Sequence, residues 1–355
     1  MPETVSLRAL DLHRFMVDLM LAAGASRQNA ECAADVHLHA DLKGIGVQGL
    51  DYVPYTIDSL ERRLIDGHAE PVIVTRRAGS AVIDGQRGLG QPAAIAAVRL
   101  ADELAREAGS ATVAVRNSTD IFMIGHYAEL LARAGKVGIV VTSGPPLVHP
   151  HGGTERLLST NPIAIGFPRG GDDPFVFDMA TSAVASSRVR QAIYEGTPLP
   201  EGSGRGPDGR PATDPTLVRQ GAISPLAGHK GFGLALGIGL LCGPLTGSGI
   251  GPELAGWQAD GETRSQGHLF IAIDTAAFGD PREIAARAEW YFDILRNSTR
   301  APDQDGVRIP GERAAEVRRR QEKDGVKVLA ATWKKVGAIA ARLGVRIPQV
   351  LETAP

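Results

Sequence analysis

The amino-acid sequence predicts a mixed α/β protein in which helices from both ends of the chain flank a middle region rich in strands. Apolar residues recur at helical spacing over roughly the first 70 residues and again after residue 281. Between residues 72 and 274, short apolar runs typical of strands alternate with helical segments. We therefore expect two lobes, a helical one from residues 1–74 together with 281–355 and a second, catalytic one from residues 75–280.

The helical lobe is predicted to start with three helices. The first spans residues 6–23, with Ser6 as its N-cap and Gly24 just past its end. The second and third span residues 26–41 and 52–64 and are separated by a glycine-containing bend. Three later segments complete the lobe, at residues 281–297, 314–325 and 332–343.

The second lobe is predicted to alternate strands with helices. Helices are expected at residues 92–108, 123–135 and 231–243. The segment 196–215 is dense in Gly, Pro and Asp and is predicted to be a surface loop. Strands are expected at residues 72–74, 81–84, 111–116, 137–142, 162–167, 174–178 and 269–274.

Composition excludes several classes of partner. The formal net charge is −2 and there is no long basic run, which argues against nucleic acid. Cys32 and Cys242 are the two cysteines, a number typical of a reduced, cytoplasmic protein. The longest apolar run, residues 231–245, is too short to span a bilayer comfortably, and no export signal precedes the first helix. We therefore expect a cytoplasmic protein with no membrane partner.

The stretch from residue 160 to residue 182 is the centre of the predicted site. Thr160 and Asn161 precede one apolar strand, and Asp178 ends the next, where rigid scaffolds commonly present functional groups. Asp178 is flanked by apolar residues, and a buried carboxylate must be paired, hydrogen-bonded or protonated. The alternative is that Asp178 caps a helix beginning near Thr181.

A glycine motif between a strand and a helix imitates a dinucleotide-binding fingerprint. In Gly88-x-Gly90-x-x-Ala93, the glycines would let a pyrophosphate approach a helix N-terminus. The match is weak, because alanine takes the last position and the following strand ends in Asn117-Ser118 without an acid for a ribose.

Two further segments carry open alternatives. Lys230 and Gly231 begin an apolar helix, where a cation opposes the helix dipole unless an anion such as a phosphate compensates. The other interpretation is a solvated lysine in a loop. His149 and His151 could bind a metal, but no acidic partner stands nearby, so we predict two loop histidines and no metal site.

Taken together, the motifs resemble those of the malate/L-lactate dehydrogenase family that does not use a Rossmann fold, whose relatives include ureidoglycolate, sulfolactate and diketogulonate oxidoreductases and Δ1-piperideine-2-carboxylate reductases. The resemblance runs almost end to end and depends on the order and spacing of the motifs. The motifs that carry it are Asp41-Leu42-Lys43-Gly44, Gly88-Leu89-Gly90, Asn117-Ser118, Pro150-x-Gly-Gly, Thr160-Asn161-Pro162, Asp178-Met179-Ala180-Thr181-Ser182, Asp208-Gly209, Lys230-Gly231-Phe232-Gly233 and Ile309-Pro310-Gly311-Glu312.

The resemblance implies a cytoplasmic homodimer that acts on a small molecule with NADH or NADPH. It implies a largely antiparallel cofactor-binding sheet, a helical lobe from both chain ends, and an active site near a subunit boundary. Asp178 is then expected to be catalytic and close to the cofactor. The residues that the resemblance assigns to the cofactor are Ser118, Thr160, Asn161, Pro162, Ser182, Lys230 and Gly231. Residues 88–93 become a turn that packs a helix.

Three positions depart from the family pattern. Gln48 and Asp120 stand where the family usually has histidines, the second of which is the usual proton donor to a carbonyl oxygen. Tyr52 stands where it typically has an arginine for the substrate carboxylate. A 2-oxo acid needs an anion clamp and an acid for the developing alkoxide, so a changed substrate is indicated.

Two hypotheses follow. In the first, the chain is an NAD(P)H-dependent reductase of a C=N group, since an iminium already carries its proton and Asp120 could stabilise its charge. Asp120 could instead act as an acid of raised pKa on an atypical ketone. Gln48 is predicted to be catalytic with Asp120 and Asp178, and Tyr52 to bind the substrate, so that Gln48 and Tyr52 would line a pocket of altered shape. The alternative is that these two are neutral polar groups at the surface. In the second, a non-redox or catalytically altered homologue binds the cofactor or a partner without dehydrogenase activity.

Overall fold

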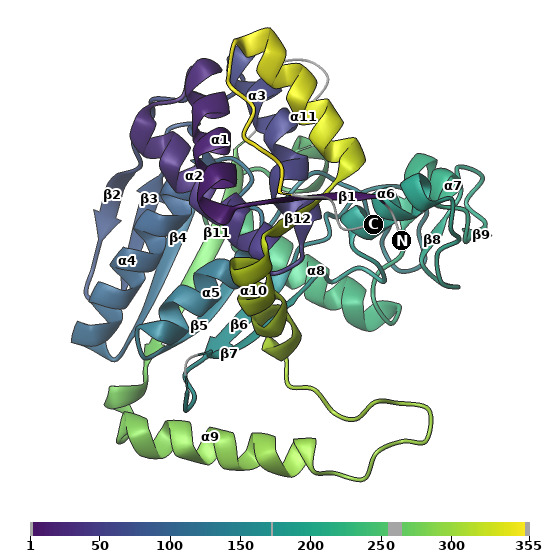
Figure 1. Ribbon diagram of the computed structural model, residues 1–355. Helices are drawn as coiled ribbons and strands as arrows, with labels where there is room; N and C mark the ends of the chain where they lie inside the picture. Colours follow the sequence, from purple (N-terminus) through teal and green to yellow (C-terminus); the bar gives the residue numbers. More distant parts are fainter. Residues whose placement is uncertain (1–2, 172, 255–264, 352–355) are drawn as a thin grey trace.

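The computed structural model describes residues 3–171, 173–254 and 265–351, and its centre is a seven-stranded sheet (Figure 1). Strands β3 and β4 run parallel, and the other neighbouring pairs are antiparallel. The strands, in sheet order, are β2 (Val72–Arg76), β3 (Ser80–Asp84), β4 (Ser110–Ser118), β11 (Gln266–Asp274), β5 (Lys136–Thr142), β6 (Ile163–Phe167) and β7 (Phe175–Met179). The predicted fold class, a mixed α/β protein with a largely antiparallel sheet, is confirmed.

Helices cover both faces of this sheet. Val113, Val140 and Phe270 point to the face covered by α4 (Gly90–Ala108) and α5 (Ile124–Arg133). Their neighbours Val141 and Leu269 point the other way and pack against α8 (His229–Cys242). Because side chains alternate along a strand, apolar residues at successive positions bury both faces of the central strands.

The helical lobe has its own core and joins segments from the two ends of the sequence. Its first strand, β1 (Thr4–Leu7), contains Ser6 and pairs with β12 (Val326–Leu329). The prediction of Ser6 as a helix N-cap was therefore wrong, and the helix begins at Ala9. The elements are β1 (Thr4–Leu7), α1 (Ala9–Ala22), α2 (Arg27–Leu42), the 3₁₀ turns η1 (Gly46–Gln48) and η2 (Leu50–Tyr52), α3 (Val53–Glu61), α10 (Glu312–Asp324), β12 (Val326–Leu329) and α11 (Ala330–Leu343).

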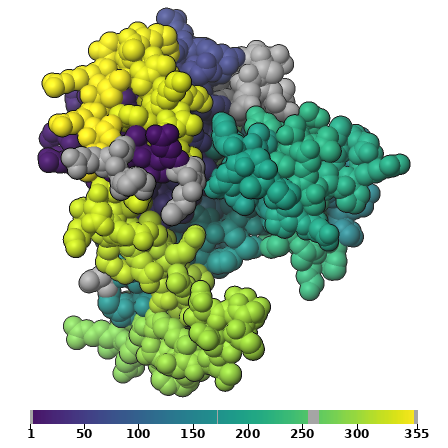
Figure 2. Space-filling view, turned by 45° about the vertical axis from the view of Figure 1, so that its right-hand side comes forward, coloured from purple at the N-terminus to yellow at the C-terminus, as the bar shows by residue number. Residues whose placement is uncertain are grey.

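A third unit packs around a separate small cluster that includes Val148, Val189 and Val218. The prediction of residues 196–215 as a loop was incomplete, because two short strands lie within it and pair with each other. Figure 2 shows the unit, in teal and green, beside a recess that separates it from the yellow helices. Its elements are α6 (Ser186–Glu195), β8 (Gly204–Arg205), β9 (Pro211–Ala212), α7 (Pro215–Gln220) and β10 (Ala222–Ile223).

Helix α9 (Pro281–Arg296) extends away from the rest of the chain (Figure 1). It has no buried residue, and its contacts include Phe292, which stacks on Phe175 of β7 with ring centroids 5.8 Å apart. The turns η3 (Gly251–Leu254) and η4 (Thr275–Ala277) flank β11 in the sequence. The division into residues 1–74 with 281–355 and residues 75–280 stays a prediction.

Candidate active site

The sheet topology gathers most of the predicted site residues at one end of the sheet. Since β4, β5 and β7 run in one direction and β6 and β11 in the other, the last residues of the first three lie beside the first residues of the other two. Ser118 pairs with Gln266, Val141 with Ile163, and Ile163 with Met179. These cross-strand pairs place Ser118, Pro162 and Asp178 at strand ends on the same edge of the sheet.

Asp178 lies at this end and caps a helix, though not the one that its sequence position suggested. Its Oδ2 accepts a hydrogen bond of 2.8 Å from the Gly125 N–H in the first turn of α5, whereas the next helix begins only at Ser186. Asp178 is an exposed residue of β7, yet the protein around its carboxylate removes much of the water that would solvate the charge. This desolvation raises the pKa of Asp178 to about 6, although the Gly125 hydrogen bond and the charge of Lys43 act in the opposite direction. Asp178 can therefore exchange a proton near neutral pH.

A buried ion-pair network stands behind Asp178. The Lys43 ammonium is bonded to the Glu129 carboxylate, which also contacts His39 Nε2 at 3.1 Å and the Arg133 guanidinium at 2.7 Å. Burial alone would raise the pKa of Glu129, but the His39 hydrogen bond and the Lys43 charge outweigh it, and the pKa is lowered. The network fixes a positive charge close enough to act on Asp178.

Asp120 lies in the loop between β4 and α5, pressed against the start of α4. A Cβ on Gly90 would come within 2.5 Å of the Asp120 carbonyl oxygen, so this glycine serves close packing of the loop. Oδ1 of Asp120 accepts a hydrogen bond of 2.9 Å from the Phe122 N–H. Burial raises the pKa of Asp120 above its usual value.

An aromatic wall adjoins Asp120. The Tyr52 and Phe122 rings meet edge to face at 5.0 Å, and Phe122 also packs 4.6 Å from the His37 ring. Phe122 has a φ of 60°, which is a strained backbone region for a bulky residue. Burial and then the charge of Asp120 raise the pKa of Tyr52. Sequence reasoning missed Phe122.

Gln48 sits in the turn η1 and is held by its backbone. Its carbonyl oxygen accepts from His37 Nδ1 at 2.9 Å, and His37 Nε2 lies 3.3 Å from the Gln91 amide nitrogen, which requires a neutral His37. Burial lowers the pKa of His37 to about 4, in agreement. The side-chain oxygen Oε1 of Gln48 is buried and has no hydrogen-bond partner among the described residues.

The segment expected to hold the cofactor is fixed by hydrogen bonds to backbone carbonyl oxygens. The Thr181 hydroxyl donates to the carbonyl oxygens of Thr160 and Asn161 at 2.8 and 3.1 Å. Nδ2 of Asn161 donates to the Ala235 carbonyl in α8 at 2.7 Å, while its buried Oδ1 lacks a partner in the described part of the chain. The Pro162 carbonyl accepts from the Thr142 N–H at 3.5 Å.

Ser118 and Ser182 use their hydroxyls within the protein. Ser118 donates to the Thr119 carbonyl at 3.4 Å, and Ser182 donates to the Val184 carbonyl at 2.7 Å. Ser143, just past the end of β5, is different: its hydroxyl is buried without a partner among residues 3–171, 173–254 and 265–351. Ser143 is a polar group at this sheet end that sequence reasoning missed.

Lys230 and Gly231 occupy the first turn of α8. Lys230 is exposed. Gly231 is buried, its N–H donates to the Leu226 carbonyl at 2.8 Å, and Leu226 in turn donates its N–H to the Thr181 carbonyl at 2.9 Å. These bonds tie the start of α8 to the end of β7, so both residues lie at the same end of the sheet as Asn161.

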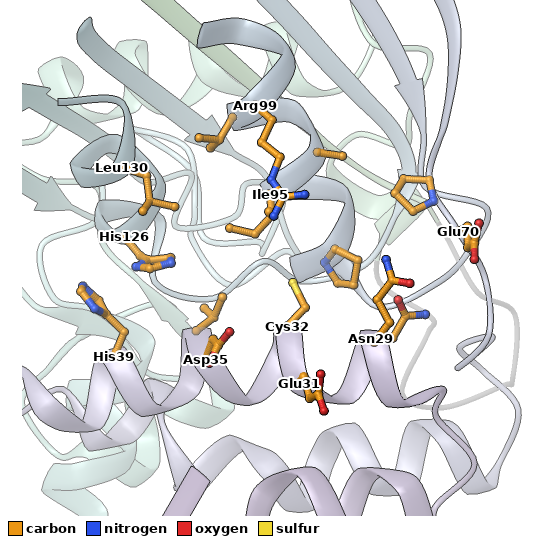
Figure 3. Close-up of a pocket in the computed structure, with 16 residues that line it drawn as sticks. Asn29, Glu31, Cys32, Asp35, His39, Glu70, Ile95, Arg99, His126 and Leu130 are labelled. Carbon is orange, nitrogen blue, oxygen red and sulfur yellow. The ribbon is translucent and has the colours of Figure 1, made fainter. Parts of the chain in front are cut away.

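Two further pairs of histidines have contacts of their own, and the His151 ring lies 6.0 Å from that of His229 at the start of α8. His149 bonds to the Pro150 carbonyl and the Ser224 hydroxyl, at 2.8 and 3.1 Å. His39 and His126 face each other at 4.3 Å in a separate pocket of about 860 Å³ between α2, α4 and α5 (Figure 3). The lining of that pocket contains none of the residues predicted for cofactor or substrate. Within the described ranges, no group of three or more His, Cys, Asp or Glu residues could hold a metal ion.

The residues at the sheet end are suited to a nicotinamide cofactor. Asn161 Oδ1 and the Ser143 hydroxyl are buried hydrogen-bonding atoms still open to a polar ligand, and the first turn of α8 offers backbone N–H groups that favour an anion. This fold and site define a class of enzymes that bind a dinucleotide without a Rossmann domain.

Comparison with known proteins identifies the family. A family model described as malate/L-lactate dehydrogenase matches residues 7–337. The L-sulfolactate dehydrogenase of Methanocaldococcus jannaschii is 34% identical, with 96% of this chain and 97% of the relative covered. The (2R)-3-sulfolactate dehydrogenase (NADP(+)) of Chromohalobacter salexigens is 35% identical, with 90% and 93% covered. The chain belongs to the malate/L-lactate dehydrogenase family.

A relative named as a reductase and a solved structure agree with this assignment. The Delta(1)-pyrroline-2-carboxylate reductase of Ancylobacter novellus is 32% identical, with 96% of this chain and 99% of the relative covered. The crystal structure of malate dehydrogenase from Entamoeba histolytica superposes with a TM-score of 0.93 at 27% identity, over 98% of this chain and 100% of that one. The predicted family, fold and class, an NAD(P)-dependent oxidoreductase, are confirmed.

The predicted roles of individual residues stay predictions, including the replacement of the two histidines by Gln48 and Asp120. None of the helices in the described part of the chain has the length and apolar character needed to cross a bilayer.

Proposed function

We propose that this protein reduces a small molecule carrying a C=N group, with NADPH or NADH as the hydride donor. The observation that carries the proposal is the position of the Asp120 carboxyl group beside the aromatic wall: its Oδ1 accepts from the Phe122 N–H at 2.9 Å, and the Phe122 ring meets the Tyr52 ring at 5.0 Å. A carboxylate and aromatic faces together suit a cation, because a ring face attracts positive charge and the carboxylate offsets it. The relative named for a pyrroline carboxylate supports this class of substrate.

The chemistry assigns simple tasks to the residues. A bound reduced nicotinamide supplies the hydride. The iminium carbon receives it, the C=N π electrons move to the nitrogen, and the nitrogen keeps the proton that it already carried. Asp120 would stabilise the cation, and Gln48 Oε1, which has no partner among the described residues, would accept the substrate N–H. Neither task needs the protein to donate a proton.

An atypical C=O substrate is the second candidate, and one observation favours it. The pKa of Asp178 is raised to about 6, and that of Asp120 is also raised, so either carboxyl group could give a proton to a carbonyl oxygen that has received a hydride. In this case the proton would have to come from the protein, unlike in iminium reduction.

The first experiment is titration of the purified protein with NADPH and with NADH, followed by calorimetry and fluorescence. We expect one of the two to bind, and Lys230→Ala to weaken that binding. Consumption of the bound cofactor is then followed with Δ1-pyrroline-2-carboxylate, Δ1-piperideine-2-carboxylate, oxaloacetate and sulfopyruvate. Turnover of an imine but neither 2-oxo acid supports the proposal. The reverse result would favour the C=O candidate, and binding of neither cofactor would favour a non-redox homologue.

We further propose a cytoplasmic homodimer. Two exposed apolar surfaces support the dimer. Helix α8 exposes Leu236 and Leu240, which are 40% and 50% exposed, on the side away from the sheet, and α9 exposes Trp290 and Ile294, which are 59% and 47% exposed. Apolar surface of this extent commonly marks an interface. Sedimentation at several protein concentrations tests it, since a monomer at every concentration would contradict the proposal.

A further inference from the structure

Arg190 crosses from the third unit to the substrate side of the site. It lies on α6, and its guanidinium stands 4.8 Å from the centre of the Tyr52 ring. Its Nη2 donates to the Val47 carbonyl at 3.2 Å and lies 3.4 Å from Asp51 Oδ2. Arg190 therefore reaches both 3₁₀ turns that carry the predicted pocket residues Gln48 and Tyr52.

The two charged groups near Tyr52 have opposite signs. The charge of Asp120 raises the pKa of the Tyr52 hydroxyl, after burial, and Arg190 lowers it through its charge and a hydrogen bond. The Tyr52 ring also packs on Phe122, whose N–H donates to Asp120 Oδ1 at 2.9 Å. One aromatic wall is thus flanked by a carboxylate and a guanidinium, an arrangement that matches a small substrate with a cationic and an anionic end.

Arg190 retains capacity for a ligand. Its contacts with Val47 and Asp51 both use Nη2, and it also hydrogen-bonds the Tyr52 hydroxyl. A guanidinium presents five N–H groups in a planar fork suited to carboxylates, so donors remain for a ligand. Asp51 is shared between Arg190 and Thr332, because its Oδ1 accepts a hydrogen bond of 2.9 Å from the Thr332 hydroxyl. The Arg190 side chain is a quarter exposed, at 25%. Its surface position leaves an edge open to solvent and to a substrate.

We propose that Arg190 determines substrate specificity by binding the acidic group of the substrate, while Asp120 faces its electrophilic end. This inference rests on the proposed function and narrows it to acidic substrates. The purely structural alternative is that Arg190 only joins α6 to the turn containing Tyr52. The alternatives differ in what they predict for substrates with and without an acidic group.

The test compares Arg190→Gln and Arg190→Lys with the wild type, using NADPH or NADH and either Δ1-pyrroline-2-carboxylate or 1-pyrroline, which lacks the carboxylate. Arg188→Gln is the matched control, since Arg188 lies on the same helix and pairs with Glu195 at 3.3 Å. We expect Arg190→Gln to raise KM for the acid at least tenfold, with a smaller change in kcat and no change for 1-pyrroline. Arg190→Lys should restore part of the loss, and Arg188→Gln should match the wild type.

A second measurement separates this proposal from the proposed function. Pyrrole-2-carboxylate cannot be reduced by hydride transfer at a C=N bond, so its binding in the presence of the cofactor is measured by calorimetry whether or not turnover is found. Weaker binding by Arg190→Gln, with an unchanged melting temperature, supports the anion site even if no imine is reduced. Equal binding by the variant and the wild type, no binding by the wild type, or an equal KM change for both pyrrolines would overturn it.

Discussion

The cofactor side and the substrate side of the candidate site are built in different ways. On the cofactor side, backbone bonds join Thr160, Thr181 and Leu226, and Gly231 packs against a neighbouring carbonyl with no room for a side chain. On the proposed substrate side, the side chains of Tyr52, Asp120 and Arg190 come from a turn, a loop and a helix, and Arg190 lies over the Tyr52 ring. A backbone-defined site tolerates few changes, whereas a side-chain-defined site can change its specificity one residue at a time.

The largest expected effect tests the backbone-defined side. A Cβ added at Gly231 would lie 2.2 Å from the Leu226 carbonyl oxygen, so Gly231→Ala must displace the backbone that joins α8 to Thr181. We expect a loss of about 1–3 kcal/mol in the free energy of unfolding, and weaker cofactor binding. Chemical denaturation and cofactor titration measure the two effects.

Gly233→Ala is the matched control, because it lies in the same helix and a Cβ there would meet nothing within 4 Å. It should stabilise α8 by roughly 0.5–1 kcal/mol and leave cofactor binding intact. If the two glycine variants behaved alike, the backbone packing at Gly231 would not define the cofactor side.

The next effect concerns the substrate side. Asp120→Asn keeps an oxygen for the Phe122 N–H but removes both the charge and the acid. We expect kcat to fall about 10²-fold while the affinity for the cofactor stays unchanged. Asp58→Asn, at an exposed position of α3 paired with Arg62, provides the control. An Asp120→Asn enzyme that kept nearly full activity would remove Asp120 from the chemistry.

The last prediction concerns the pH dependence of stability. Asp41 is buried under the turns of the substrate side and accepts the Leu50 N–H at 2.8 Å. Burial raises its pKa from 3.8 to about 8, so between these values the folded state holds a proton that the unfolded state has lost. This contribution to stability is complete below pH 3.8 and disappears as the pH rises through 8.

Asp41→Asn should remove that contribution, since an amide does not titrate in this range. We expect the stability difference between pH 5 and pH 9 to be smaller in the variant than in the wild type, as measured by urea denaturation at both values. The same pH dependence in both proteins would show that another group is responsible.

The strands of the proposed cofactor side were easier to predict from the sequence than the contacts of the proposed substrate side, for a physical reason. Apolar runs bounded by small polar residues indicated β6 and β7, and their ends do lie together. Gly90 imitated a nucleotide loop because the same absence of a Cβ serves close packing against Asp120.

Arg190 and Phe122 could not be found in this way. Arg190 reaches Tyr52 from more than a hundred positions along the sequence, through the folding of α6 against η2. Phe122 lies at a positive φ, which no local pattern of a bulky residue indicates. Contacts that depend on the tertiary fold leave no periodic signal in the sequence.

The contacts between the C-terminal elements α10 and β12 and the start of the chain have a consequence for how the protein folds during synthesis. Gln321 of α10 donates to the carbonyl oxygens of Asp41 and Leu42, a contact that spans 280 positions in the first case. During synthesis, the turns with Gln48 and Tyr52 leave the ribosome early but lack these anchors until residues 321–329 have followed. Such distant contacts form slowly. A nascent chain stopped before residue 321 would carry every cofactor-side residue, while the substrate side would still await its anchors.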